Sequence, residues 1–241
     1  MTTLDLGPGS SAGAPRARRD IARFTTAERA LHWSFALLLG TCAVTGFILY
    51  VGPVTAVVGR REMVRSVHVW AGVAMLLPFV VAYLGGWRDA VRRDVRRLAR
   101  WSWEDRRWLW TRGRQQTGAV AKFNAGQKAN AAFVAGVVPL MLATGGIMRW
   151  YEPFPLSWRT GATFVHDWTA IATWLVVTGH ILFALSRPPA LRSMVGGRMS
   201  RAYAEDHHPR WAAGAERDPQ RDPQQEPERS DAEQGDPARR T

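Results

Sequence analysis

Four long runs without a charged residue limit what this chain can fold into. They cover approximately residues 31–51, 67–87, 129–148 and 168–186, and none contains Asp, Glu, Lys or Arg. A helix of about 20 apolar residues is long enough to cross a hydrocarbon core of ~30 Å. The sequence therefore predicts an all-α integral membrane protein built as a bundle of four transmembrane helices, with the last helix covering about 165–186.

The segments on either side of these runs differ from them in composition. Residues 1–23 are rich in Gly, Ser, Ala, Pro and Arg, and residues 191–241 are dominated by Arg, Asp, Glu, Gln and Pro. Such segments bury too little apolar surface to offset the entropy lost on ordering. We expect one four-helix domain over 24–190 between two disordered tails, and we assign no ligand role to His207 and His208.

The net charge of +12 comes almost wholly from arginine, and the position of these residues argues against a nucleic-acid-binding protein. Lys and Arg number five before residue 31, twelve in the connector 88–128 and ten from residue 187 onward, against three and two in the other two connectors. Basic residues favour the cytoplasmic side of a membrane protein. The sequence therefore predicts that both termini and the 88–128 connector are cytoplasmic.

Four histidines, His32, His68, His166 and His180, lie in these runs or at their rims. Polar side chains at membrane depth are a functional hypothesis by default. In the predicted topology His32 and His180 lie near the cytoplasmic face, whereas His68 and His166 lie near the outer face. Each pair could supply the two axial ligands of a low-spin haem iron.

The spacing of two of these histidines agrees with a pair of stacked haems. His166 and His180 are 14 residues apart, close to four helical turns, which separates them by ~21 Å on one helix face. Interfacial histidines, a proton relay, or a zinc or copper site with carboxylate or thiolate companions remain as alternatives. The single cysteine, Cys42, is expected to be a small core residue, and the absence of a CxxCH motif predicts non-covalent haem.

The segment Lys122-Phe123-Asn124-Ala125-Gly126-Gln127-Lys128 precedes the third run on the predicted cytoplasmic side. An ordinary helix start is one interpretation of it. Alternatively, Asn124, the Gly126 backbone and Gln127 could hydrogen-bond a quinone carbonyl near His180. A helix N-terminus would also stabilise the negative charge that develops on a reduced quinone oxygen.

This segment, together with His32-Trp33 and the pair His166 and His180, resembles the cytochrome b (gamma) subunit of membrane-bound formate dehydrogenases, within the prokaryotic di-haem cytochrome b family. The resemblance covers about residues 24–190, and Phe123 stands where that family is expected to have Tyr. It implies two haems b and a menaquinone site. The implied ligands are His68 and His166 for the outer haem, His32 and His180 for the inner haem, and Asn124, Gly126, Gln127 and His180 for menaquinone.

The resemblance also implies a function and partners. Electrons would arrive from an outer iron–sulfur beta subunit, which serves a molybdenum or tungsten catalytic alpha subunit, and would reduce menaquinone near the cytoplasmic face. The chain would then be a multi-pass electron-transfer subunit of an oxidoreductase complex in the plasma membrane of a prokaryote, in contact with lipid and the quinone pool. Two alternatives are a cytochrome b that serves a nickel–iron hydrogenase or another molybdoenzyme, and a membrane anchor without haem.

Overall fold

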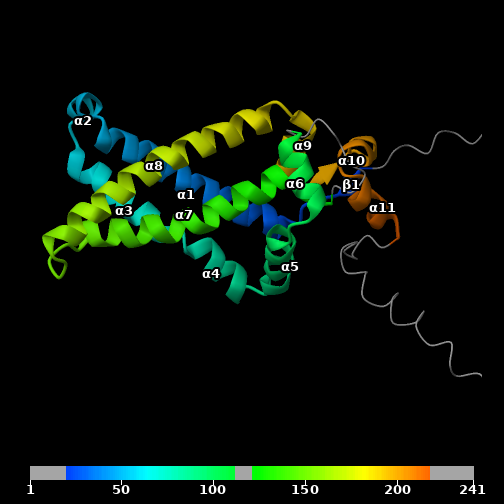
Figure 1. Ribbon diagram of the computed structural model, residues 1–241, viewed down its shortest axis with the longest axis horizontal. Coiled ribbons are helices and arrows are strands. Elements are labelled where there is room, and N and C mark those ends of the chain that lie inside the picture. Colours follow the sequence, from blue (N-terminus) through cyan, green and yellow to red (C-terminus); the bar gives the residue numbers. More distant parts are fainter. Residues whose placement is uncertain (1–19, 112–120, 218–241) are drawn as a thin grey trace, which may run out of the picture.

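Four long apolar segments run along one axis of the molecule (Figure 1). The structure, a computed structural model, describes residues 20–111 and 121–217. Each segment is long and apolar enough to cross a membrane, which confirms a mostly helical protein with four candidate spans. These spans are α1 (Thr26–Tyr50), α3 with α4 (Arg61–Ala74 and Leu77–Leu84), α7 (Ala125–Arg149) and α8 (Leu156–Leu185).

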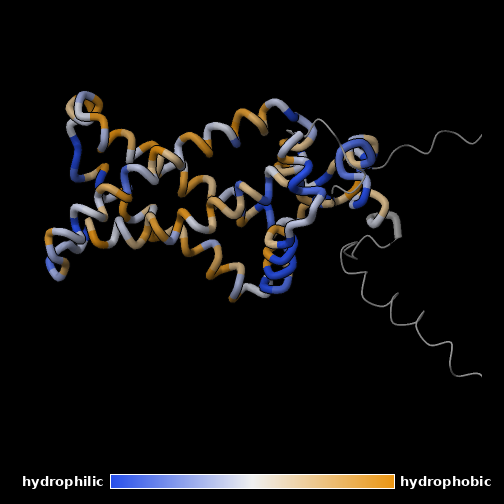
Figure 2. Tube along the Cα trace, viewed as in Figure 1, coloured by the Kyte–Doolittle hydropathy of each residue, from blue (hydrophilic) through white to orange (hydrophobic). Residues whose placement is uncertain are grey.

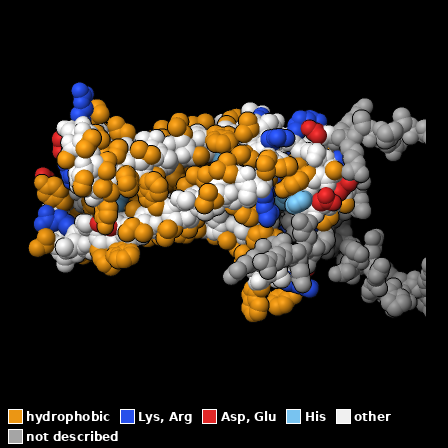
Figure 3. Space-filling view, turned by 90° about the horizontal axis from the view of Figure 1, so that it is seen from above, with side chains coloured by type: hydrophobic (Ala, Val, Ile, Leu, Met, Phe, Trp, Pro, Cys, Tyr) orange, Lys and Arg blue, Asp and Glu red, His pale blue; other side chains and the backbone are white. Residues whose placement is uncertain are grey.

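The outward surface of these helices is apolar. Only 6% to 17% of each span's most hydrophobic window is buried, and large side chains such as Leu37 and Leu175 are 72% exposed. Figures 2 and 3 show hydrophobic residues along the length of the bundle and charged residues gathered at its two ends. Exposed apolar surface of this extent requires lipid rather than water as its solvent.

The spans are arranged as two helix pairs. Helix α1 packs along α3, and α7 packs along α8, whereas contacts between these two pairs are few. Each pair is joined by a short connection at the same end of the molecule: α2 (Gly52–Val58) follows α1, and residues 150–155 link α7 to α8. The bundle therefore has two halves, α1 with α3 and α7 with α8, which are each closely packed but make few contacts with each other.

Each span begins earlier than the sequence predicted. Helix α1 starts at Thr26 because Thr25 caps it, accepting a hydrogen bond from the Glu28 N–H at 3.2 Å while the Glu28 carboxylate accepts one from the Thr25 N–H at 2.6 Å. The charged Glu28 thus belongs to the first turn of α1, so the helix extends beyond the uncharged run that was used to predict it. The second span is interrupted between Ala74 and Leu77, just before Pro78, because a proline ring clashes with the preceding helical turn.

The basic end of the bundle carries several shorter helices outside the spans. They are α5 (Arg88–Ala99), α6 (Trp103–Trp110) and α9 (Pro188–Gly196), and all three lie at the end where α1 and α7 begin and α8 finishes (Figure 1). The predicted connector 88–128 therefore contains two helices among its described residues. Both α5 and α6 contact α7.

The second tail is ordered through residue 217, which differs from the expectation of disorder. Strand β2 (Arg198–Met199) pairs antiparallel with β1 (Ile21–Ala22), and α10 (Arg201–His207) and α11 (Pro209–Arg217) follow it. A few apolar residues suffice for this, because they pack on one another and on the strand from the other end of the chain. The cluster consists of Met199, Ala204, Trp211 and Ala212, with Ile21 and Tyr203 against it. Residues 1–19 and 218–241, also predicted to be disordered, lie outside the described residues.

His208 joins this tail to the rest of the basic end of the bundle. Its Nδ1 lies 2.9 Å from the Ala121 carbonyl oxygen, and its Nε2 lies 3.0 Å from Arg23 Nη2. Burial, followed by the nearby Arg23 guanidinium, lowers the pKa of His208 to about 3. A neutral ring therefore donates through Nδ1 and accepts from Arg23, which is a structural role.

A buried ion pair fastens α6 to the start of α7. Lys128 Nζ lies 2.7 Å from Asp105 Oδ2 and donates to the Arg100 carbonyl oxygen at 2.8 Å. Both side chains are buried. A buried ammonium is costly without a counter-charge, and Asp105 on α6 supplies it for Lys128 on α7. The ion pair therefore holds α6 against the start of α7.

Replacing Asp105 with alanine should destabilise the protein by about 3–5 kcal/mol, because it leaves the Lys128 ammonium buried without a partner carboxylate. Thermal unfolding of the detergent-solubilised chain measures this as a lower melting temperature. The double variant Asp105→Leu/Lys128→Met removes both charges and should recover part of the loss. An unchanged melting temperature in Asp105→Ala would show that the Asp105–Lys128 ion pair does not stabilise the protein.

Candidate functional site

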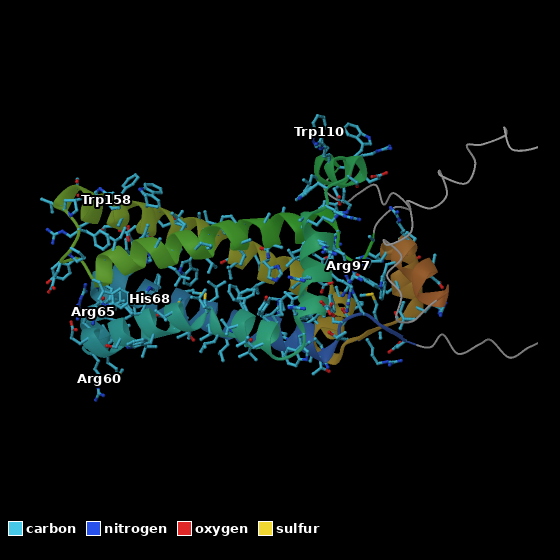
Figure 4. The ribbon with its side chains drawn as sticks, turned by 90° about the horizontal axis from the view of Figure 1, so that it is seen from below. Arg60, Arg65, His68, Arg97, Trp110 and Trp158 are labelled. Atoms are coloured by element: carbon cyan, nitrogen blue, oxygen red, sulfur yellow. The ribbon has the colours of Figure 1, made fainter. Side chains whose placement is uncertain are left out.

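The four histidines come together as two pairs that bridge the two halves of the bundle. His32 on α1 faces His180 on α8, with ring centroids 6.5 Å apart. His68 on α3 faces His166, also on α8, with ring centroids 6.3 Å apart. Figure 4 places His68 at the end that carries Arg60 and Arg65, far from Arg97 at the opposite end.

The separation of the rings fits two imidazoles bound to one metal. With metal–nitrogen bonds of about 2 Å on opposite sides, the two ring centroids lie roughly 6 Å apart. Each pair takes one histidine from the α1–α3 half and one from the α7–α8 half. Since these halves have few contacts of their own, the geometry fits a flat group held between them by axial ligands.

The pair His68 and His166 has matching supports on the two sides. Thr45 Oγ1 lies 3.0 Å from His68 Nδ1, and the Cys42 carbonyl oxygen lies 3.1 Å from the same atom. On the other side, Thr144 Oγ1 lies 3.0 Å from His166 Nδ1, and the His166 ring also hydrogen-bonds the Met141 backbone. The two halves of the bundle thus hold the two rings in the same way.

These supports fix the tautomer of both rings. Each threonine hydroxyl donates to the carbonyl one turn earlier on its own helix, so its oxygen can accept from the imidazole. Nδ1 therefore carries the proton, and Nε2 is left to bind a metal. Hydrogen bonds of this kind orient a ligating imidazole and raise its basicity.

A glycine follows each of these threonines, and the histidine rings explain why. A Cβ at Gly46 would lie 3.2 Å from His68 Cε1, and one at Gly145 would lie 3.2 Å from His166 Cε1. A larger residue would displace the ring that the preceding threonine holds. The sequence interpretation missed Thr45 and Thr144, although a Thr-Gly dipeptide inside an apolar helix was a visible signal. The same dipeptide also occurs in α8, at residues 160–161 and 178–179.

The pair His32 and His180 has fewer protein contacts. His32 Nδ1 is buried and has no hydrogen-bond partner among the described residues, and the same holds for Nε of Arg29 and of Arg159. Arg29 lies one turn before His32, and Arg159 lies at the opposite end, near the start of α8. Unpaired donors of this type suit the carboxylates of a haem.

No cluster of three or more His, Cys, Asp or Glu side chains suitable for a metal ion occurs in residues 20–111 and 121–217. Cys42 is buried, with its Sγ 3.6 Å from the His68 carbonyl oxygen. It packs against α3 as the small core residue that the sequence predicts.

The segment predicted to bind quinone forms the start of α7. Asn124 Oδ1 accepts from the Gln127 N–H at 2.9 Å, and Gln127 Oε1 accepts from the Asn124 N–H at 3.0 Å. This capping box is the ordinary helix start that the sequence left open. It uses the two side-chain oxygens, so the amide N–H groups remain as donors.

Two aromatic contacts surround this helix start. A Cβ at Gly126 would lie 3.1 Å from Cη2 of Trp108, so α6 approaches α7 at a glycine. The Phe123 ring lies 6.3 Å from that of Phe24. Helix α7 begins at the same end as His32 and His180, but no hydrogen bond joins the start of α7 to either ring in the described structure.

Most of the chain matches a known protein family. A family model described as prokaryotic cytochrome b561 matches residues 23–197, which include all four histidines and the start of α7. The match begins and ends close to the predicted domain 24–190.

Individual relatives are cytochrome b556 subunits of formate dehydrogenases. The b556(fdo) subunit of Escherichia coli K12 is 28% identical over 204 residues, which cover 80% of this chain and 93% of that protein. The nitrate-inducible b556(Fdn) subunit of the same strain is 24% identical over 79% of this chain and 89% of its own length. The cytochrome b556 subunit from Haemophilus influenzae is 24% identical over 79% of this chain and 82% of its own length.

Replacing Thr45 with valine should raise the midpoint potential of a haem ligated by His68, because His68 Nδ1 loses one acceptor and the imidazole becomes less basic. A hydrogen bond of about 1 kcal/mol corresponds to roughly 40 mV for one electron, so a rise of a few tens of millivolts is expected. Spectroelectrochemical titration measures it. Thr41→Val is the matched control, because the Thr41 hydroxyl donates to the Leu37 carbonyl oxygen one turn earlier on α1. Equal potentials in both variants would contradict the assignment.

Proposed function

Because this chain belongs to the prokaryotic cytochrome b561 family, we propose that its two histidine pairs hold two haems b and that it is the cytochrome b subunit of a formate dehydrogenase complex. The observation that carries this proposal is the facing of histidines across the bundle at two levels, 6.3 Å and 6.5 Å between ring centroids. His68 and His166 would bind one iron, and His32 and His180 the other. Two strong axial ligands give a low-spin centre suited to reversible one-electron transfer.

The separation of the two levels supports a path for electrons across the membrane. His166 and His180 are 14 residues apart on the continuous helix α8, which corresponds to ~21 Å along its axis. The protein contributes the axial nitrogens, their orientation and an apolar surrounding that excludes water. Arg29 at one end and Arg159 at the other are the donors suited to the carboxylates of the two haems.

We assign the end that carries α5, α6 and α9 to the cytoplasm. The arginine-rich helix α5 and the ordered tail lie at this end, and basic residues concentrate there in the sequence. Both chain termini would then be cytoplasmic, as expected from the charge count. The pair His32 and His180 would be the inner site, in the plasma membrane of a prokaryote.

The partners follow from the relatives, whose names identify them as subunits of formate dehydrogenases. An iron–sulfur beta subunit on the outer side would deliver electrons that originate at a molybdenum or tungsten alpha subunit. Menaquinone would accept them near the inner pair. This chain would hold no residue for formate oxidation and would serve as the quinone-reducing part of the complex.

The amide groups at the start of α7 support the location of the quinone. Asn124 and Gln127 retain N–H donors after their oxygens have capped the helix, and Gly126 lies between them. The helix N-terminus adds a partial positive charge, which favours the reduced form of a quinone oxygen. We therefore retain Asn124, Gly126, Gln127 and His180 as the quinone site.

Replacing His68 with alanine should lower the haem content from two to one per chain, because one axial ligand of the outer iron is lost. The remaining haem should still be reduced by a menaquinol analogue. Pyridine haemochrome assays on the purified full-length chain measure the ratio. His207→Ala is the control, since the His207 ring stacks on Tyr203 at 3.9 Å and lies outside both pairs. Full haem content in His68→Ala would overturn the ligand assignment, and a wild-type chain without haem would favour the membrane-anchor alternative.

Replacing Asn124 with serine should slow oxidation of the pre-reduced haems by a menaquinone analogue, while the haem content stays at the wild-type value. Serine preserves the N-cap acceptor but removes the amide donors, so the helix start survives the change. Stopped-flow absorbance measures the rate. Ser200→Asn makes the opposite exchange at the N-cap of α10 and should leave the rate unchanged. Wild-type kinetics in Asn124→Ser would remove that residue from the quinone site.

A further inference from the structure

Three segments that are distant in the sequence bring two carboxylates and a lysine together at the end of the bundle. Lys122, just before α7, binds Glu28 on α1 and lies 3.4 Å from Asp94 Oδ1 on α5. The carboxyl groups of Glu28 and Asp94 also hydrogen-bond each other. The three side chains are only 8% to 15% exposed.

Two largely buried carboxylates that share one lysine repel each other, which favours a proton on one of them. The other charged groups that face Asp94 in the described structure are Lys122 and Arg97, whose Nη1 lies 2.7 Å from Oδ1. Burial, then the hydrogen bond to Glu28, raises the pKa of Asp94 to about 7 despite these two cations. The pair can therefore gain and lose a proton near neutral pH.

The carboxyl pair lies close in the chain both to the inner histidine pair and to the segment proposed to bind quinone. Glu28 lies four residues before His32 on α1, and residues at this spacing are neighbours on one helix face. Lys122 lies two residues before Asn124, the N-cap of α7. The pair thus connects the helix of the inner haem ligand with the segment assigned to quinone.

Two further hydrogen bonds from the residues just before α1 hold the cluster in place. Glu28 Oε2 accepts from the Thr25 N–H at 2.6 Å, which leaves Oε1 for Lys122. The Lys122 carbonyl oxygen accepts from Arg23 Nη2 at 3.2 Å. The geometry of the carboxyl pair is therefore set in advance by the helix cap and by Arg23.

We propose that Glu28 and Asp94, positioned by Lys122, form the proton-donating pair for the quinone reduced at the start of α7. This proposal rests on the proposed function. Reduction of a quinone to a quinol takes up two electrons and two protons. A proton would leave the Glu28–Asp94 pair for a quinone oxygen as an electron arrives, and the partly exposed pair would be reprotonated from water.

The test uses the full-length chain with its haems, reduced chemically and then mixed with menadione at a series of pH values. In the wild type, the rate of haem oxidation should fall as pH rises through about 7, because Asp94 loses the proton that it donates. Asp94→Asn and Glu28→Gln should slow the reaction roughly 100-fold and remove this pH dependence. Asp94→Glu should restore both.

Asp89→Asn is the matched control, since it makes the same change on the same helix at an exposed position. Its rate and pH profile should equal those of the wild type. A second readout does not depend on turnover. Difference infrared spectra between mildly acidic and alkaline pH should contain a protonated-carboxyl band that disappears in Asp94→Asn and persists in Asp89→Asn.

The outcomes separate this proposal from the one on which it rests. A wild-type chain whose haems menadione does not oxidise would overturn both. If menadione oxidises the haems of the wild type and the variants keep the wild-type pH profile, the proton-donating role alone is overturned. This holds even if the variants are slower by the same factor at every pH. If Asp94→Asn does not assemble haem, Glu28→Gln and Asp94→Glu provide the same comparison.

Discussion

The facing of imidazole rings between the two halves of the bundle is the contact on which the rest of the structure depends. Helices α1 and α3 pack on each other, as do α7 and α8, but the two halves share few contacts. In lipid no hydrophobic driving force holds apolar helices together, so their association depends on close packing and polar contacts, which are few between the two halves. A group bound on both sides by histidine would fix the spacing of the halves, which joins assembly of the bundle to cofactor binding.

The end of the bundle that carries the short helices is organised by buried charge as well as by apolar packing. Lys122 connects α1 with α5, Lys128 connects α6 with α7, and Arg23 connects the tail through His208. Each of these cations has its partner in a segment far away in the sequence. This network positions the start of α7, where a quinone is proposed to bind, against the helix that carries His32.

The spans and the histidine pairing could be predicted from the sequence because each depends on a local pattern. Runs of apolar residues set the helices, and depth along them pairs His32 with His180 and His68 with His166. The supports of these rings could not be predicted so directly, since Thr45 touches His68 only when α1 packs on α3. The ordered tail was missed for a similar reason: Met199 and Trp211 become buried only by meeting a strand from the opposite end of the chain.

The central claim is that two bis-histidine haems b lie one above the other between the two halves. The most direct measurement is the haem-to-chain ratio of the purified wild-type protein, combined with electron paramagnetic resonance of its oxidised form. The account predicts two haems per chain, both low-spin with bis-histidine signals. A single haem, or a high-spin signal that persists in intact protein, would contradict it.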